Sequence, residues 1–367
     1  MKPPINLPNL ETTRQQSPGS ARVPRAGFGV PPKRTLKSSR LGLRVSVWKS
    51  SRLESPSRRD AETSTRDAYA PRSSRPRAFF PCLLGLLALA FSVCADEPIK
   101  HRLLLAEYGS SANRLVELDA DGKLVWEHQP PSTMVIFEPL QNGNILYGYG
   151  GKPTGVREVT ARGVEVFNYV SKSAQVFGCS RLANGNTLVA EQGPAQAVEV
   201  NVKGEVVHVT PLHTSHEPFH QQVRNVHQLA NGNILAAHEG EGAVREVDAA
   251  GKVVWEFTGI PMAADAQRLA NGNTLIACGT QKRVIEVTPD KQIAWEFGAA
   301  DASELNLTWI FSVQQLKNGN LIVGNFLRGQ EGEGAHVFEV TREKKVVWKW
   351  ADHALVKALT TVRVIGE

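Results

Sequence analysis

The chain has 367 residues and a formal net charge of +6, with 41% hydrophobic and 21% charged residues. The positive charge is concentrated in the first 78 residues, which hold 17 Lys and Arg against 5 Asp and Glu, so the rest of the chain is net negative. This distribution argues against nucleic acid as a partner, because the basic residues would then be expected on the folded domain. The remaining residues are numerous enough to bury a hydrophobic core.

Residues 1–78 form the first segment and are rich in Ser, Pro and Arg. Such a composition cannot bury enough apolar surface to fold, so we predict a disordered basic arm. The arm contains no second Met. Two explanations stay open: a start site assigned too far upstream, or a genuine basic targeting extension.

Residues 79–95 follow as an uncharged apolar run of 17 residues that ends in Val93-Cys94-Ala95. Arginines before the run and a small residue at its end are typical of a signal peptide. The run is short for a spanning helix. We therefore expect cleavage after Ala95, a secreted or periplasmic location and no stable membrane span. The alternative is a protein anchored by its uncleaved signal.

The rest of the chain is built from a repeat that is marked by the tripeptide Asn-Gly-Asn. The five copies begin at Asn142, Asn184, Asn231, Asn271 and Asn318. Asn-Gly favours a tight hairpin, because Gly adopts positive φ without cost and Asn tolerates it. In each unit an apolar strand follows, then a strand of alternating character, a second turn, and a strand with a large ring. Four short strands of this kind form one blade of a β-propeller.

The two ends of the repeat region complete each other. Residues 103–126 match the last three strands of a unit, and residues 360–364 resemble a first strand with nothing after it. We therefore predict an all-β fold over residues 96–367. It is a six-bladed β-propeller of four antiparallel strands per blade, closed by the C-terminal strand in the first blade. Closure removes the exposed edges of an open array.

One acidic position is shared by all six units and lies on the third strand of each. It is occupied by Glu117, Glu158, Glu199, Glu246, Glu286 and Glu339. Such uniformity favours a structural role within each blade over convergence on one ligand.

A variable position lies at the end of each second strand, near the face that carries the variable loops. It is occupied by Glu107, Tyr149, Glu191, His238, Cys278 and Asn325. This mixture indicates a ligand site on that face, for a small molecule, a glycan or a protein, since loops on a rigid scaffold commonly bind. The alternative is six ordinary solvated strand ends.

Two further patterns suggest metal binding. The connection 210–225 contains His213, His216 and His220, whose imidazoles could hold Zn²⁺ or Cu²⁺. The sequence Glu-Gly-Glu-Gly-Ala occurs at 239–243 and 331–335, where its carboxylates could hold Ca²⁺. An exposed connection and simple repeat ancestry explain the two patterns equally well.

The repeat, with Leu-Ala-Asn-Gly-Asn and Gly-Lys-Val-Val-Trp-Glu-Phe, resembles the PQQ-like (quinoprotein-type) propellers, and within them the arylsulfotransferase-like group. The resemblance covers residues 101–367 and implies an exported six-bladed propeller. Arylsulfotransferases carry sulfate on a histidine, but the matching position is Ala264. The eight units and the Thr-Gly repeat of PQQ enzymes are also missing, so the resemblance does not imply PQQ.

The leading hypothesis is an exported binding or scaffold propeller with its ligand site on the variable face. The alternative is an enzyme, either sulfotransferase-like or a metal-assisted lyase or hydrolase. Its candidate catalytic residues are His227, His238 and Arg224.

Overall fold

The structure is a computed structural model that describes residues 100–109 and 113–366. The basic arm and the signal peptide predicted above lie outside the described residues. Among the residues that are described, no helix is long and apolar enough to cross a membrane.

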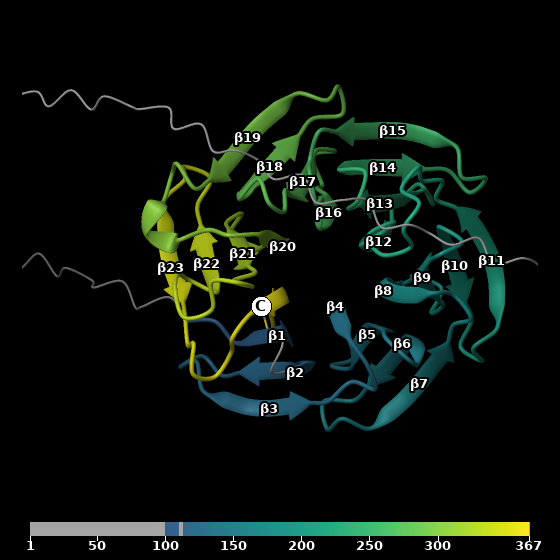
Figure 1. The fold of residues 1–367 in the computed structure, drawn as a ribbon, viewed down its shortest axis with the longest axis horizontal. Helices are drawn as coiled ribbons and strands as arrows, with labels where there is room; N and C mark the ends of the chain where they lie inside the picture. Colours follow the sequence, from purple (N-terminus) through teal and green to yellow (C-terminus); the bar gives the residue numbers. More distant parts are fainter. Residues whose placement is uncertain (1–99, 110–112, 367) are drawn as a thin grey trace, which may run out of the picture. The chain divides into compact units, whose positions relative to one another are not determined.

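Within residues 100–109 and 113–366, twenty-four strands form six four-stranded antiparallel sheets, arranged as blades around a centre (Figure 1). Blade 1 consists of β24 (Leu359–Val364), β1 (Leu103–Tyr108), β2 (Asn113–Leu118) and β3 (Leu124–His128). Blade 2 consists of β4 (Met134–Pro139), β5 (Ile145–Gly150), β6 (Thr154–Val159) and β7 (Glu165–Val170). Blade 3 consists of β8 (Gln175–Arg181), β9 (Thr187–Gln192), β10 (Gln196–Val200) and β11 (Val206–Pro211).

The other three blades repeat this plan. Blade 4 consists of β12 (Asn225–Gln228), β13 (Ile234–His238), β14 (Ala243–Val247) and β15 (Val253–Thr258). Blade 5 consists of β16 (Asp265–Arg268), β17 (Thr274–Ala277), β18 (Arg283–Val287) and β19 (Ile293–Gly298). Blade 6 consists of β20 (Ile310–Gln315), β21 (Leu321–Asn325), β22 (Val337–Val340) and β23 (Val346–Trp350), and the 3₁₀ turn η1 (Ser303–Leu305) precedes it. The predicted fold class is confirmed.

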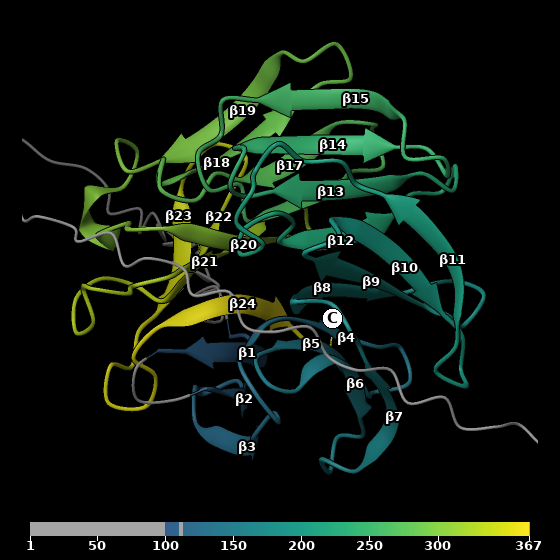
Figure 2. The same cartoon turned by 45° about the vertical axis from the view of Figure 1, so that its right-hand side comes forward.

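The ring closes through its C-terminal strand, as the sequence predicts. β24 pairs antiparallel with β1, and the two strands lie side by side in Figure 2. The backbone N–H of Ile365 donates to the carbonyl of Arg102 at 3.0 Å, so the pairing continues past the strand ends. The side chains of Leu359, Val362 and Val364 are buried in the core between blades 1 and 6. Closure therefore supplies both hydrogen bonds and apolar contacts.

The repeated glutamate has the structural role that its uniformity indicates. In blade 5, Glu286 accepts hydrogen bonds from the side-chain amides of Asn271 (3.3 Å) and Asn273 (2.6 Å). It also pairs with Arg342 of blade 6. In blades 2, 3, 4 and 6 the matching glutamate likewise accepts from the Asn-Gly-Asn turn of its own blade. The tripeptide thus fixes the turn and holds the carboxylate.

An arginine from the next blade often completes this arrangement. Arg268 of blade 5 donates to Glu246 of blade 4 at 2.8 Å, and its guanidinium lies 5.1 Å from the ring centroid of Trp255. Arg181 and Arg342 repeat the contact between other blades, over Phe167 and Trp295. The large ring on the fourth strand therefore joins neighbouring blades through charge and stacking.

Candidate functional site

A cavity of about 190 Å³ is lined by residues of blades 1, 2, 3, 4 and 6 and of the connection that leads into blade 5, on the face that carries the variable loops; we call it the axial cavity. Its lining residues are Tyr108, Val135, Phe177, His220, Gln221, Arg224, Glu239, Met262, Trp309, Phe311, Phe326, Arg328 and Thr360. They come from the inner strands, from the ends of the second strands and from the connections between blades. The axial cavity is therefore formed only when the ring is complete.

β-Bulges on four inner strands turn side chains into the axial cavity. The pairing register of β24, β4, β8 and β20 with the neighbouring strand shifts near the variable face. The shifted stretches contain Thr360, Val135, Phe177 and Phe311, and all four line the cavity. A bulge inserts an extra residue and re-aims its side chain. The backbones of blades 2 and 3 lie very close together at this point, because a Cβ added to Gly148 would lie 2.2 Å from the carbonyl oxygen of Phe177.

A buried ion pair forms part of the cavity wall. Arg224 and Glu239, with 4% and 1% of their surface exposed, are joined by a hydrogen bond and an ion pair. The guanidinium of Arg224 also lies 4.8 Å from the ring centroid of Phe177. Gln221 donates to the other carboxylate oxygen of Glu239 at 3.2 Å. These two charges neutralise each other and are held rigidly.

Two polar groups in the axial cavity are not committed in this way. The indole Nε1 of Trp309 is buried and has no hydrogen-bond partner among the described residues. Arg328 forms no ion pair with a carboxylate in the described part of the chain, and its guanidinium lies 5.9 Å from the ring centroid of Tyr108. The ring of Phe326 is near both Trp309 and Tyr108, with centroid distances of 5.7 Å and 6.1 Å. The cavity thus presents a donor and a cation beside aromatic faces.

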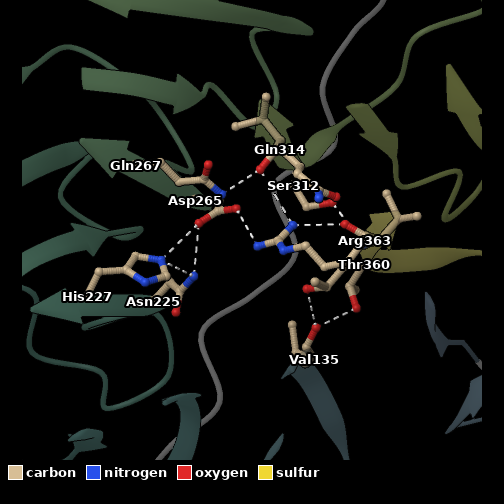
Figure 3. A network of polar contacts seen from close by, with 12 residues as sticks. Val135, Asn225, His227, Asp265, Gln267, Ser312, Gln314, Thr360 and Arg363 are labelled. Carbon is tan, nitrogen blue, oxygen red and sulfur yellow. Dashed lines mark hydrogen bonds and ion pairs between the residues drawn. The ribbon is translucent and has the colours of Figure 1, made fainter. Parts of the chain in front are cut away.

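A polar network links inner strands around the axis (Figure 3). Asp265 accepts from Asn225 (2.9 Å) and Arg363 (3.2 Å), and His227 Nε2 lies 3.7 Å from its Oδ1. Burial alone would raise the pKa of Asp265, but the contacts with His227 and Asn225 and the charge of Arg363 outweigh it and lower the pKa to about 2. Gln267 donates to the backbone of the next inner strand at 2.7 Å. The network joins inner strands of different blades, whose inner edges have no further strand to pair with.

The six second-strand residues predicted to form a ligand ring are all buried, and none lines the axial cavity. Glu107 accepts from Arg114 (2.8 Å) and from the backbone of Lys357 (2.9 Å). Glu191 accepts from Tyr169 (2.9 Å) and from Gln196. Glu107 thus bonds within blade 1 and to the segment before β24, and Glu191 bonds within blade 3 and to β7 of blade 2.

The other ring positions serve similar structural roles. Tyr149 donates to Asn168 at 2.8 Å, and Asn325 accepts from the backbone of Thr308 at 2.9 Å. Burial raises the pKa of the Cys278 thiol to about 12, so it stays protonated. The predicted ring is therefore displaced by one residue. The next residues in three blades, Tyr108, Glu239 and Phe326, do line the axial cavity.

The candidate catalytic residues are not brought together. His227 pairs in register with Leu235, three residues before His238, which corresponds to about 10 Å along a strand. His238 is fully buried, with neither ring nitrogen bonded within the described chain. Arg224 is held by Glu239. Although Arg224 lies across from His238 in the strand pairing, no two of the three form a hydrogen bond or ion pair among the described residues, so the geometry there gives no nucleophile and base in contact.

The structure does not bring the predicted metal ligands together. Among the described residues no three His, Cys, Asp or Glu side chains are placed to hold a metal ion. His216 contacts the backbone oxygen of His220 at 3.1 Å, while the ring of His220 contacts Gln175 and His213 has no partner in common with them. In the 239–243 loop the carboxylates are engaged by arginines. Because the carboxylates of this loop are paired with arginine side chains, they form no cluster that could hold Zn²⁺ or Ca²⁺.

A second hollow, of about 790 Å³, lies on the face of the Asn-Gly-Asn turns. Its arginines are already paired, Arg102 with Glu117 at 2.7 Å and Arg363 with Asp265. The walls are formed by repetitive turns and strand ends. The axial cavity is therefore the better candidate site.

Fold and cavity together define the class of protein: a six-bladed β-propeller with a small aromatic-lined cavity on its axis. Neither a protein-family model nor a curated protein matches the sequence. The chain is similar to the crystal structure of a protein of unknown function from Bacteroides caccae, with 26% identity and a TM-score of 0.64, over 72% of this chain and 98% of that one.

Two other solved structures share the fold. A streptogramin B lyase structure is 11% identical with a TM-score of 0.51, over 71% of this chain and 86% of that one. A chain of the nidogen/laminin complex is 9% identical with a TM-score of 0.53, over 71% of this chain and 97% of that one. At such identities the likeness supports the propeller architecture alone.

Proposed function

We propose that this protein is an exported binding propeller that holds a small molecule in the axial cavity. The observation that carries the proposal is the set of four bulges that turn inner-strand side chains into one cavity. Bulges are irregularities typical of functional sites. The inner network around Asp265, which joins β12, β16 and β24, shows that inner strands can instead bond to one another across the axis.

The size and lining of the cavity favour a small molecule over a protein or a glycan. About 190 Å³ is below the usual range for drug-sized ligands, about 300–1,000 Å³. Mostly apolar walls with a few polar groups are typical of small-molecule sites. A stable protein interface would need about 800 Å² from each partner, far more than this cavity offers.

The export part of the proposal is supported by the signal-like residues 79–95. N-terminal sequencing of the protein recovered from the periplasm or the medium tests it. A first residue of Asp96 is expected, whereas a chain retained in the cytoplasm with residues 79–95 intact would overturn it. The relation to PQQ-like propellers is likewise proposed, on the repeat motif. Ala264, buried where a sulfate-carrying histidine would stand, gives no support for sulfotransfer.

Binding is tested by screening neutral and charged compounds of about 12 heavy atoms or fewer for shifts in Tm and tryptophan fluorescence. Val135→Phe fills the axial cavity, and Val166→Phe on the exposed strand β7 is the matched control. We expect hits that bind wild type and the control equally but bind Val135→Phe at least about tenfold more weakly. No hit, or hits indifferent to Val135→Phe in a folded variant, would refute the proposed site.

A further inference from the structure

The geometry points to a planar aromatic carboxylate as the ligand of the axial cavity; this inference rests on the proposed function and adds the chemical class. Three properties of the lining support it: its unpaired guanidinium, its unpaired indole donor and its flat aromatic walls.

The charge of the cavity comes from Arg328. Arg224 and Glu239 also line the cavity, but they are paired with each other. Arg328 is exposed and has no carboxylate within ion-pair distance among the described residues, where only the exposed Glu331 acts on its charge, so its guanidinium donors stay unpaired. A guanidinium recognises a carboxylate through parallel N–H donors, and such charge-assisted bonds are about twice as strong as neutral ones.

The unpaired donor is the indole N–H of Trp309. Indole nitrogen is a donor only, and a buried donor without a partner is costly. Trp309 Nε1 is buried and lacks a partner in the described chain, although the side chain lines the cavity. The buried Nε1 has almost no accessible surface, so the indole has to turn toward the cavity before an acceptor on the ligand can satisfy it. A carboxylate supplies acceptors for both Trp309 and Arg328.

The shape of the cavity fits one ring. Tyr108, Phe177, Trp309, Phe311 and Phe326 all line it, and neighbouring rings lie at tilted or edge-on angles. Aromatic pairs prefer such offset and edge-to-face arrangements, which a planar ligand ring can extend. An apolar cavity of about 150 Å³ accommodates benzene. A cavity of about 190 Å³ therefore accommodates a benzene ring with one carboxylate.

Isothermal titration of the mature protein with three probes tests the inference. Benzoate is the predicted ligand type, benzamide is its neutral near-isostere, and cyclohexanecarboxylate keeps the charge without the flat ring. We expect benzoate to bind at least about tenfold more tightly than benzamide, because an ionic acceptor faces an unpaired guanidinium. We also expect it to bind more tightly than cyclohexanecarboxylate.

Variants assign the recognition to the two residues. Arg328→Gln should abolish the preference for benzoate over benzamide, and Arg328→Lys should keep part of it because the charge remains without the planar fork. Trp309→Phe should weaken the binding of benzoate several-fold. Arg283→Gln is the matched control, because Arg283 is a partly exposed residue at the start of β18 that does not line the cavity, and it should bind as wild type does. Thermal melting confirms that each variant is folded.

The outcomes separate this inference from the proposed function. Benzamide binding as tightly as benzoate, with both lost in Val135→Phe, would overturn the carboxylate inference and keep the site. Screening hits that bind in the cavity but include neither aromatic acids nor their analogues would also overturn the carboxylate inference and keep the site. A screen without any hit would overturn the proposed function itself. An unchanged benzoate preference in Arg328→Gln would show that another group carries the recognition and would also overturn the inference.

Discussion

Arg224 and Glu239 form a buried ion pair in the wall of the axial cavity, and the guanidinium of Arg224 stacks against Phe177 of the neighbouring blade. The pair joins the connection before blade 4 to the loop between its second and third strands. It therefore fixes two of the variable segments that surround the axis.

Removing one partner of this pair should destabilise the protein strongly. We expect Arg224→Ala to lower the free energy of unfolding by about 3–5 kcal/mol, because Glu239 is left as an uncompensated buried charge. Urea unfolding measures the change. Arg283→Ala is the control, since Arg283 and Glu296 form an exposed pair, with side chains 31% and 48% exposed, that contributes about 1 kcal/mol or less. Equal losses in the two variants would contradict the buried role of Arg224.

The contact of Arg268 with the preceding blade should also contribute to stability. We expect Arg268→Ala to lower the free energy of unfolding by about 1–2 kcal/mol, because Glu246 loses a charge-assisted hydrogen bond and Trp255 loses a stacked guanidinium. Gln228 occupies the same register position in blade 4, where it pairs with Ile234 as Arg268 pairs with Thr274. Gln228→Ala should therefore change stability by less than about 0.5 kcal/mol. A comparable loss from Gln228→Ala would show that strand propensity, not the inter-blade contact, is measured.

The buried His238 should make the fold sensitive to acid. Burial, assisted by the charge of Arg245, lowers the pKa of His238 to about 4, whereas an unfolded histidine titrates near 6.5. The unfolded state therefore binds more protons as pH falls from about 6.5 to 4, and stability is lost over that window. From pH 7 to pH 5 the loss from this one group is about 2 kcal/mol.

Urea titrations of wild type and His238→Gln at pH 7 and pH 5 measure this contribution. The variant should show a smaller loss on acidification by about 2 kcal/mol. His208→Gln, on the exposed face of β11, should retain the wild-type loss. The same pH dependence in wild type and His238→Gln would show that His238 does not titrate as described.

Ring closure by β24 can be tested by moving the termini. Deleting residues 359–367 should abolish cooperative unfolding, because it removes the inner strand of blade 1 and exposes the edge of β1. A circular permutant that joins residues 366 and 101 by a short linker and opens the turn between Asp290 and Lys291 should fold, since the natural ends are already hydrogen-bonded neighbours. Circular dichroism and thermal melting distinguish the two. A deletion that melts like wild type would contradict closure by β24.

The sequence predicted the fold because its signals are local and repeated. Asn-Gly-Asn determines a turn by itself, and each copy sits in a unit with the same order of strands. Glu286 shows why the repeated acid could be assigned a structural role: its partners Asn271 and Asn273 lie in the same repeat. The third partner, Arg342, lies in the next blade, and no periodicity identifies it.

From the sequence, the candidate site could be assigned to one face of the propeller but not to the residues that line the cavity. The six residues predicted as a ligand ring, His238 among them, are buried away from the axial cavity, while the next residue lines the cavity in three blades, as Tyr108, Glu239 and Phe326. Phe177 and Phe311 were missed because bulges turn them inward, and a bulge depends on pairing between strands rather than on local sequence. The available signal was the aromatic character of these residues on inner strands.

A crystal structure of the mature domain soaked with benzoate tests the axial site directly. We expect density for the ligand in the axial cavity, with its carboxylate in hydrogen-bond contact with Arg328 and with the Trp309 indole, and its ring against Phe326. Density in the hollow on the opposite face instead, or an axial cavity without ligand at concentrations that saturate binding in solution, would contradict it.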